Sequence, residues 1–386
     1  MDLTEFLYFA KKHFALFPGV KAPISAPAFA NHYAQRQRQR STLRASLDAV
    51  IGTAFQAWIP LRAKAVERKF KLGDAWRRNA IDIARRRFVD PNDIALFRIE
   101  RADQLDGYIR RFEDAAFNKI INPAGWKPDC GLMNKTRFYK RCAKNGLPHP
   151  DVVANLESGV AELVAPLTGP MIAKPSRGEG GRGVFAFDHG LPLDRASAAA
   201  LVARNPDMAK GAWVVQRRLV PDPAIADIAL NALPTVRMTT ILNEGGAPEL
   251  VNAVIRLASR EDVVVDNMKA GGILSSVDLK TGTLGIGCKG YGGGDHEVHP
   301  VTGAPITGRV LPHWTAAVAL VVDAHARGFG EYALIGWDVA LTPEGPVLVE
   351  GNAKPGVLMP QRSGRRGLAN QRYGELLAWH LARVTA

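Results

Sequence analysis

The sequence predicts an α+β protein with two unlike parts: a basic, mostly helical N-terminal region and a longer part built from short apolar strands and helices. Helix-like apolar runs fill residues 43–121. From residue 171 onward, short runs rich in Val, Ile, Leu and Thr are separated by Gly and Pro. At 386 residues the chain exceeds one ordinary domain, and we expect the helical region to occupy residues 1–128.

The N-terminal region holds most of the positive charge. Residues 1–120 contain 22 Lys and Arg against 13 Asp and Glu, in a chain of net charge +13. We expect helices over 43–70, broken near Pro60, over 74–88 and over 107–121. The basic clusters 36–40 and 85–87 are typical either of a face that docks an acidic partner or a membrane surface, or of a solvated helix face. No nucleic-acid-binding motif occurs, so we do not expect a nucleic acid partner.

Composition predicts a cytoplasmic protein with reduced thiols. No apolar stretch approaches the ~20 residues of a membrane span, so no transmembrane segment is expected. The first five residues are acidic rather than basic. Cys130, Cys142 and Cys288 are too few and too scattered for a disulfide framework or a zinc site.

A short strand at 171–175 runs directly into a glycine-rich loop. Four glycines lie between residues 176 and 183, and the chain returns as a strand at 184–187. Such a loop can close its backbone N–H groups over an anion, and Lys174 would add a positive charge on phosphates. An ordinary flexible hairpin tip is the alternative. The loop is not a Walker motif, because no Gly-Lys-Ser/Thr opens a helix after it.

Strands predicted over 213–219, 233–242 and 250–257 carry polar residues. Arg237 and Arg256 each interrupt a run of β-formers. A charge inside a strand is costly unless it is paired, so each arginine either meets a carboxylate or awaits an anionic ligand. Two such arginines directed at one predicted phosphate site favour the binding of an anionic ligand over a purely structural ion pair.

A β-hairpin is predicted over 335–352, with its turn at 342–346. Glu350 and Asn352 are two residues apart and therefore point to one face of a strand, where Asp338 can meet them. Three oxygen-bearing side chains suit Mg²⁺. A solvated hairpin with polar strand ends is the alternative.

The order of these parts resembles the ATP-grasp superfamily. The matching parts are Asn134-Lys135 before a helix, residues 146–150, the strand ending at Lys174 with its loop, the strand reaching Gln216, and the polar hairpin. Within the superfamily the chain resembles the sugar-transfer-associated ATP-grasp family. The residues that carry this likeness are Leu233–Arg237, Val265–Asn267, Gly271–Gly272, Thr302–Gly303, Ile335–Asp338 and Glu350–Asn352.

The resemblance implies two α+β lobes, about 129–215 and 216–386, that clamp ATP between them. Lys135 and Lys174 would hold the phosphates, under a loop that includes Ser176, Gly180, Gly181 and Arg182. Gln216, with the backbone of Arg217 and Leu219, would meet the adenine, and Asp222 would meet the ribose. The position of Gln216 is often acidic in the family, so this chain departs from the family pattern there. Asp338, Glu350 and Asn352 would carry two Mg²⁺ ions, with Mn²⁺ as an alternative.

The resemblance also suggests a catalytic set. Many amino-acid ligases of the superfamily place an arginine two residues before the first metal aspartate, where this chain has Gly336. We expect Arg256 or Arg237 to stabilise the transferring phosphoryl group instead, together with Lys174. Asn267 corresponds to an asparagine that lies near the reacting phosphate in related enzymes.

The activity that these parts predict is an ATP-dependent carboxylate–amine ligase. A small-molecule carboxylate would form an acyl phosphate, and an amine would displace phosphate to give an amide. A small-molecule kinase on the same fold is the alternative, and a nucleotide-binding regulatory module ranks third because all three metal ligands are present. We expect the glycine-rich segment 285–300 to be a loop near the acceptor pocket rather than a metal site at His296 and His299. Arg362, Arg365 and Arg366 could hold a substrate carboxylate or be surface charges.

Overall fold

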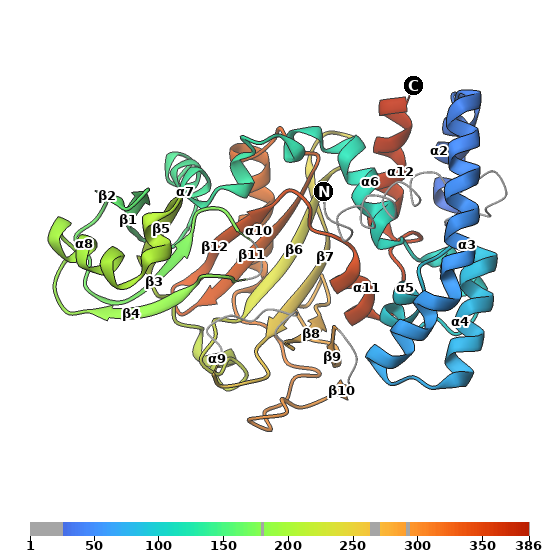
Figure 1. Cartoon of the computed structure of the whole chain (residues 1–386). Coiled ribbons are helices and arrows are strands. Elements are labelled where there is room, and N and C mark those ends of the chain that lie inside the picture. The colour runs from blue at the N-terminus through green and yellow to red at the C-terminus, as the bar shows by residue number, and fades with distance from the viewer. Residues whose placement is uncertain (1–25, 179–180, 263–270, 291–293, 386) are drawn as a thin grey trace.

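The computed structural model describes residues 26–178, 181–262, 271–290 and 294–385. Two antiparallel sheets and a group of N-terminal helices make up the molecule (Figure 1). The helices are α2 (Ala30–Arg38), α3 (Thr42–Phe70), α4 (Asp74–Arg87), α5 (Pro91–Phe97), α6 (Arg111–Ile121), α7 (Lys135–Lys144), α8 (Arg195–Arg204), α9 (Pro223–Ala226), α10 (Trp314–Asp323), α11 (Leu358–Gly364) and α12 (Arg372–Thr385).

The first sheet has five strands in the order β2-β1-β5-β3-β4. Its strands are β1 (Val152–Glu157), β2 (Val160–Leu163), β3 (Gly169–Pro175), β4 (Phe185–His189) and β5 (Ala212–Arg217). Alternate residues of β1, β3 and β5 point to one face and pack there with α8, around Ala154, Met171 and Trp213. The β3–β4 hairpin is the one that the sequence predicts around the glycine-rich loop.

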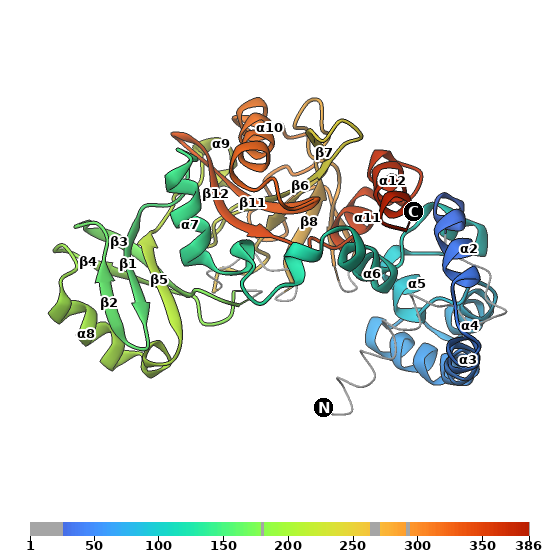
Figure 2. The same ribbon diagram turned by 90° about the horizontal axis from the view of Figure 1, so that it is seen from above.

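The second sheet has seven strands in the order β10-β9-β8-β7-β6-β11-β12. They are β6 (Thr235–Leu242), β7 (Pro248–Leu257), β8 (Ile273–Ser276), β9 (Gly287–Lys289), β10 (Asp295–His296), β11 (Leu334–Thr342) and β12 (Gly345–Asn352). α10 packs on this sheet and α7 stands between the two sheets (Figure 2). All nine residues of β11 are buried, because this strand lies between β6 and β12.

The N-terminal helices form a separate small core. Ile59 of α3 packs with Ile83 of α4 and Ile94 of α5. The predicted break at Pro60 is wrong: α3 runs unbroken from Thr42 to Phe70 with Pro60 inside it. Proline removes one helical hydrogen bond, and packing on α4 and α5 on both sides of Pro60 keeps the helix continuous.

α6 and α12 connect this helical part to the seven-stranded sheet. Asn118 of α6 donates to the Ala353 carbonyl at 3.0 Å, just after β12. Asn122 donates to the Leu334 carbonyl at 2.8 Å, at the start of β11. The Tyr373 hydroxyl of α12 donates to Asp114 of α6 at 2.8 Å. The polar hairpin is therefore anchored at its open end by buried amide side chains. The division of the chain at 128/129 and 215/216 stays a prediction.

Candidate active site

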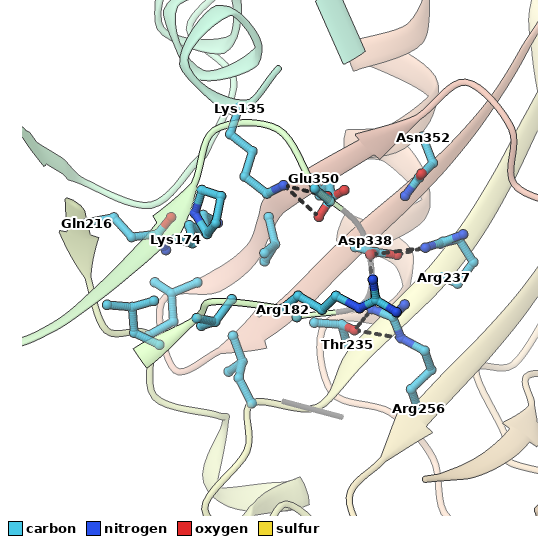
Figure 3. Close-up of a pocket in the computed structure, with 18 of the residues that line it drawn as sticks. Lys135, Lys174, Arg182, Gln216, Thr235, Arg237, Arg256, Asp338, Glu350 and Asn352 are labelled. Carbon is cyan, nitrogen blue, oxygen red and sulfur yellow. Dashed lines mark hydrogen bonds and ion pairs between the residues drawn. The ribbon is translucent and has the colours of Figure 1, made fainter. Parts of the chain in front are cut away.

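A cavity of about 390 Å³ opens where the two sheets approach each other (Figure 3). Its walls come from β3 and β5 of the first sheet and from β6, β7, β11 and β12 of the second. Its charged lining residues are Lys135, Lys174, Arg182, Arg218, Arg237, Arg256, Lys354, Asp338 and Glu350. Seven cations thus face two carboxylates, a balance that favours a ligand with several negative charges.

The hairpin places its polar residues as the sequence predicts. Asp338 on β11 pairs in register with Glu350 on β12, and Gly336 pairs with Asn352. The register then shifts by one residue between Asp338 and Val339, so that Val349 has no partner opposite it on β11. All three oxygen-bearing side chains line the cavity.

Asp338 is held by two arginines from neighbouring strands. The Arg237 guanidinium contacts its two carboxylate oxygens at 2.5 and 3.2 Å, and Arg256 Nη2 contacts Oδ2 at 3.0 Å. Burial disfavours the charged carboxylate, but the two guanidiniums outweigh it and hold the pKa of Asp338 well below its usual range. Both strand arginines therefore meet a carboxylate, one of the two alternatives that the sequence left open.

Pro355 and Arg237 together leave no space for a side chain at residue 336. A Cβ on Gly336 would lie 2.6 Å from the Pro355 Cβ and 3.2 Å from the Arg237 Cδ. The Arg237 side chain thus passes through the space beside residue 336. That Arg237 or Arg256 takes the role of an arginine at residue 336 stays a prediction.

Lys174 is buried on the opposite wall and is held by a tyrosine. Its Nζ donates to the Tyr139 hydroxyl at 2.6 Å. Burial lowers the pKa of Lys174 to about 7, nearby Lys135 lowers it as well, and Glu350 and Asp338 act in the opposite direction. A multiply charged anion in the cavity would favour the charged lysine, because it brings an opposite charge to a desolvated ammonium.

The Tyr139 hydroxyl links both sheets. It lies 3.0 Å from Gln216 Oε1 on β5 and 2.7 Å from the carbonyl of Val349, the residue left without a partner on β12. A phenol has one proton to donate. If that proton goes to the Val349 carbonyl, the contact with Gln216 is a hydrogen bond only when the amide nitrogen of Gln216 faces the phenol and donates to it. The amide oxygen of Gln216 then points away from Tyr139. An acceptor in that orientation would suit the amino group of adenine.

Lys135 joins the glycine-rich loop to the hairpin. Its Nζ donates to the Gly178 carbonyl at 3.2 Å and lies 3.7 Å from Glu350 Oε2. Gly181 and Gly183 have positive φ of 71° and 74°, a conformation that side chains rarely adopt. Gly181 and Arg182 line the cavity, so this part of the loop faces the site.

The cavity also has an apolar side. Ile172, Val184, Leu219, Leu233 and Met359 line it beside Gln216. A flat aromatic group such as a purine would gain by leaving water against such a surface.

Several residues predicted for the nucleotide site lie elsewhere. Ser176 is fully buried beneath α7, where its hydroxyl donates to Asn134 at 3.1 Å. Arg217 points outward and pairs with Asp151 at 3.0 Å. Asp222 caps α9 through Ala224 N at 2.8 Å and contacts His313 at 3.1 Å. None of the three lines the cavity, and Gly180 and Asn267 lie outside the described residues.

The structure adds residues that the sequence analysis did not single out: Tyr139, Thr235 and Lys354. Tyr139 stands four residues after Lys135 on α7, a spacing that puts both on one face. Thr235 accepts from Arg256 and fixes that side chain. Lys354 follows the hairpin closely and lies 3.9 Å over the Trp126 ring. The signal available in the sequence for Lys354 was a basic residue just after the polar hairpin.

The oxygen donors of the hairpin fit a hard divalent cation. Among the residues that the structure describes, no three His, Cys, Asp or Glu side chains form a group that could hold a metal. Two carboxylates and one amide nevertheless line the cavity together at Asp338, Glu350 and Asn352. Oδ2 of Asp338 accepts from both arginines, whereas within the described part of the chain Oδ1 accepts from Arg237 alone and keeps one lone pair for a further ligand. His299 has a different role from metal binding, since its Nε2 contacts the Ala258 carbonyl at 2.7 Å.

The sequence matches the family described as sugar-transfer associated ATP-grasp over residues 115–374. The chain belongs to this family, which confirms the resemblance and the predicted ATP-grasp fold with its helical N-terminal region. No curated protein matches the chain.

Several solved structures resemble parts of the protein. An L-amino acid ligase from Bacillus licheniformis has 13% identity and a TM-score of 0.34, over 58% of this chain and 41% of that chain. A D-alanine–D-alanine ligase from Bacillus anthracis complexed with ATP has 11% identity and a TM-score of 0.38, over 66% of each chain. A biotin carboxylase from Campylobacter jejuni has 12% identity and a TM-score of 0.41, over 66% of this chain and 46% of that chain. This chain thus spans less than half of two of these proteins. At such scores the structures carry no argument about its substrates.

Proposed function

We propose that the protein is an ATP-dependent carboxylate–amine ligase that forms an amide through an acyl phosphate and releases ADP and phosphate. The observation that carries the proposal is the cavity between the two sheets, where seven basic side chains surround the two carboxylates and the amide of the polar hairpin. Family membership supplies the expectation that the anion is ATP with Mg²⁺. Phosphoryl transfer needs positioning and neutralisation of spread negative charge, and such a site is suited to both.

Each wall would have its own task. Lys135, Lys174 and the loop at Gly181 and Arg182 would hold the phosphates. The purine would lie against the apolar side beside Gln216 and Leu219. Mg²⁺ held by Asp338, Glu350 and Asn352 would neutralise phosphate charge. Gly180 in the loop and Asn267 near the reacting phosphate stay predictions. Asp222 near the ribose also stays a prediction, although Asp222 does not line the cavity.

The bond changes would take place beside Arg237 and Arg256. A substrate carboxylate oxygen attacks the γ-phosphorus, and the bond to the β-phosphate oxygen breaks to leave ADP. The amine nitrogen then attacks the acyl carbon, phosphate leaves and the nitrogen loses a proton. The arginines would stabilise the charge that spreads over the transferring group, since they already converge on one carboxylate of the site.

The test is release of ADP and phosphate from ATP and Mg²⁺ with pooled carboxylic acids, each with and without pooled amines. We expect phosphate release to require both an acid and an amine. ADP accompanied by a stable phosphorylated product, without any need for amine, would identify a kinase and refute the ligase. Glu350→Gln should lower either activity by orders of magnitude, whereas Glu344→Gln on the exposed hairpin turn should leave it unchanged.

A further inference from the structure

Helix α3 is apolar on two opposite faces. Its inner face buries Ile59, Ala63 and Val66 within the N-terminal helical core. Its outer face exposes Leu43, Leu47, Val50 and Leu61, at 83%, 47%, 67% and 70% of their surface. An apolar stripe along a helix is normally covered, either by the rest of the protein or by a partner. We therefore expect the outer face of α3 to be an interaction surface.

The exposed residues form one line rather than a scatter. Leu43, Leu47, Val50, Ala54, Ala57 and Leu61 follow one another at alternating steps of four and three residues, all exposed. This apolar line extends along the helix for about 27 Å. In the described part of the chain, four of the fifteen exposed large hydrophobic side chains belong to it. Isolated exposed leucines need no explanation, but a contiguous row marks an interaction site.

The same face carries only positive charge. Lys64, Arg68 and Lys69 are exposed toward the C-terminal end of α3, and none of its described exposed residues is acidic. The helix has two acidic residues, Asp48 and Glu67. Asp48 is buried and paired with Arg40 at 3.0 Å, and Glu67 is paired with Arg77 at 2.7 Å.

This charge pattern decides which partner fits. Pairing with a second copy would offer Lys64, Arg68 and Lys69 no acidic side chain of the partner helix: a parallel pair would bring them onto the same cations, and an antiparallel pair would bring them toward the start of α3, where no exposed residue is acidic. An anionic bilayer accepts both parts of the face: leucines enter the boundary between headgroups and acyl chains, and basic groups meet lipid phosphates. No helix among the described residues is long and apolar enough to cross a membrane, so α3 would lie on the surface.

We propose that the outer face of α3 docks the protein on an anionic lipid surface. Both views place α3 at the end of the molecule away from the five-stranded sheet (Figures 1 and 2). Docking there leaves the cavity between the sheets open. The proposal does not depend on the reaction catalysed, because the residues of the apolar line lie outside the cavity lining.

The experiment is co-sedimentation of the full chain with vesicles of phosphatidylcholine alone or mixed with phosphatidylglycerol. We expect binding to the mixed vesicles only. L43S/L47S/L61S should lower the partition coefficient at least about tenfold, because three large apolar side chains are lost. K64Q/R68Q/K69Q should lower it by about fivefold for each charge and reduce the salt dependence. L191S is the matched control, since Leu191 is 73% exposed and lies away from α3.

Other outcomes would overturn the proposal. One is the absence of binding to any vesicles, and another is equal binding to neutral and mixed vesicles. A third is that L191S lowers the partition coefficient as much as L43S/L47S/L61S does. Dimers in light scattering that the serine variant dissociates, without lipid binding, would identify a contact between copies. Binding to polyglutamate that depends on the basic residues but not on the leucines, without lipid binding, would identify an acidic macromolecule. Unchanged melting temperature and ATP affinity would show that the variants are folded.

Discussion

Replacing Tyr139 by phenylalanine tests the proposed nucleotide site through one hydroxyl group. That hydroxyl accepts from Lys174 at 2.6 Å and lies 2.7 Å from the Val349 carbonyl on the other sheet. The ring fills the same space in phenylalanine, so the packing of α7 is preserved. The variant therefore removes the polar link between the sheets and leaves Lys174 without its acceptor.

The magnitude follows from the charge on Lys174. A hydrogen bond to a charged group is worth about 1.5–3 kcal/mol, and about 1.4 kcal/mol corresponds to tenfold in affinity. Bound phosphates can replace part of the lost contact, so we expect ATP affinity to fall about tenfold. The lost acceptor also lowers the pKa of Lys174 further below its value of about 7. The charged lysine is then depleted at a lower pH than in the wild type.

The assay is ATP binding by calorimetry between pH 6 and 9. The ATP affinity of the wild type should decline as pH rises through the pKa of Lys174. The ATP affinity of the variant should begin to decline at a lower pH, so the two affinities should be most similar at the acidic end of the range. Tyr373→Phe is the matched control, because it also removes a buried hydroxyl bond, to Asp114 at 2.8 Å, but far from the cavity. Equal affinity and an unshifted pH profile in Tyr139→Phe, with only a lower melting temperature, would refute the reasoning.

Three further predictions concern the hairpin and the helical part. Glu350→Gln should lower turnover by orders of magnitude at an unchanged melting temperature, because a ligand proposed for Mg²⁺ is weakened, and wild-type turnover in this variant would refute the metal role of Glu350. Gly351→Ala should destabilise by about 1–3 kcal/mol in chemical denaturation, since its Cβ would lie 2.5 Å from Leu132 and 2.9 Å from Phe138; an unchanged midpoint would contradict this packing. Burial raises the pKa of Asp114 to about 7, so the folded state holds a proton that the unfolded chain releases above its ordinary pKa of 3.8. Stability should fall as pH rises between these two values, and Asp114→Asn should lack that slope in denaturation curves across the same range.

The sequence was sufficient to predict the parts of the site that depend on local spacing. Glu350 and Asn352 share a face because strand side chains alternate with a period of two. The strand carrying Lys174 and the glycine-rich loop could be recognised in the same way. These predictions required only that the segments be strands, which their apolar runs and flanking turns indicated.

Residues whose position depends on tertiary contacts could not be placed in this way. The ion pair of Arg217 with Asp151 joins residues far apart in the sequence, and no local pattern indicates it. Asp222 looked available for a ligand, yet it caps the short helix α9. The role of Tyr139 depends on the register shift that leaves the Val349 carbonyl available, and no local sequence pattern indicates that shift. The continuity of α3 through Pro60 likewise depends on packing against α4 and α5.

The position of Asp338 connects the predicted metal role and the predicted arginine role. A buried carboxylate that lost Arg237 and Arg256 would be left as an uncompensated charge, which is strongly unfavourable. The arginines in turn are kept in place by Asp338 before any phosphate arrives, so little reorganisation is needed when charge develops on a ligand. Pairing in register on adjacent strands, Arg237 with Asp338 and Thr235 with Arg256, fixes this arrangement in the sheet itself. The rigid seven-stranded sheet thus holds the groups proposed for chemistry, while the first sheet and its glycine-rich loop contribute the groups proposed to hold the nucleotide.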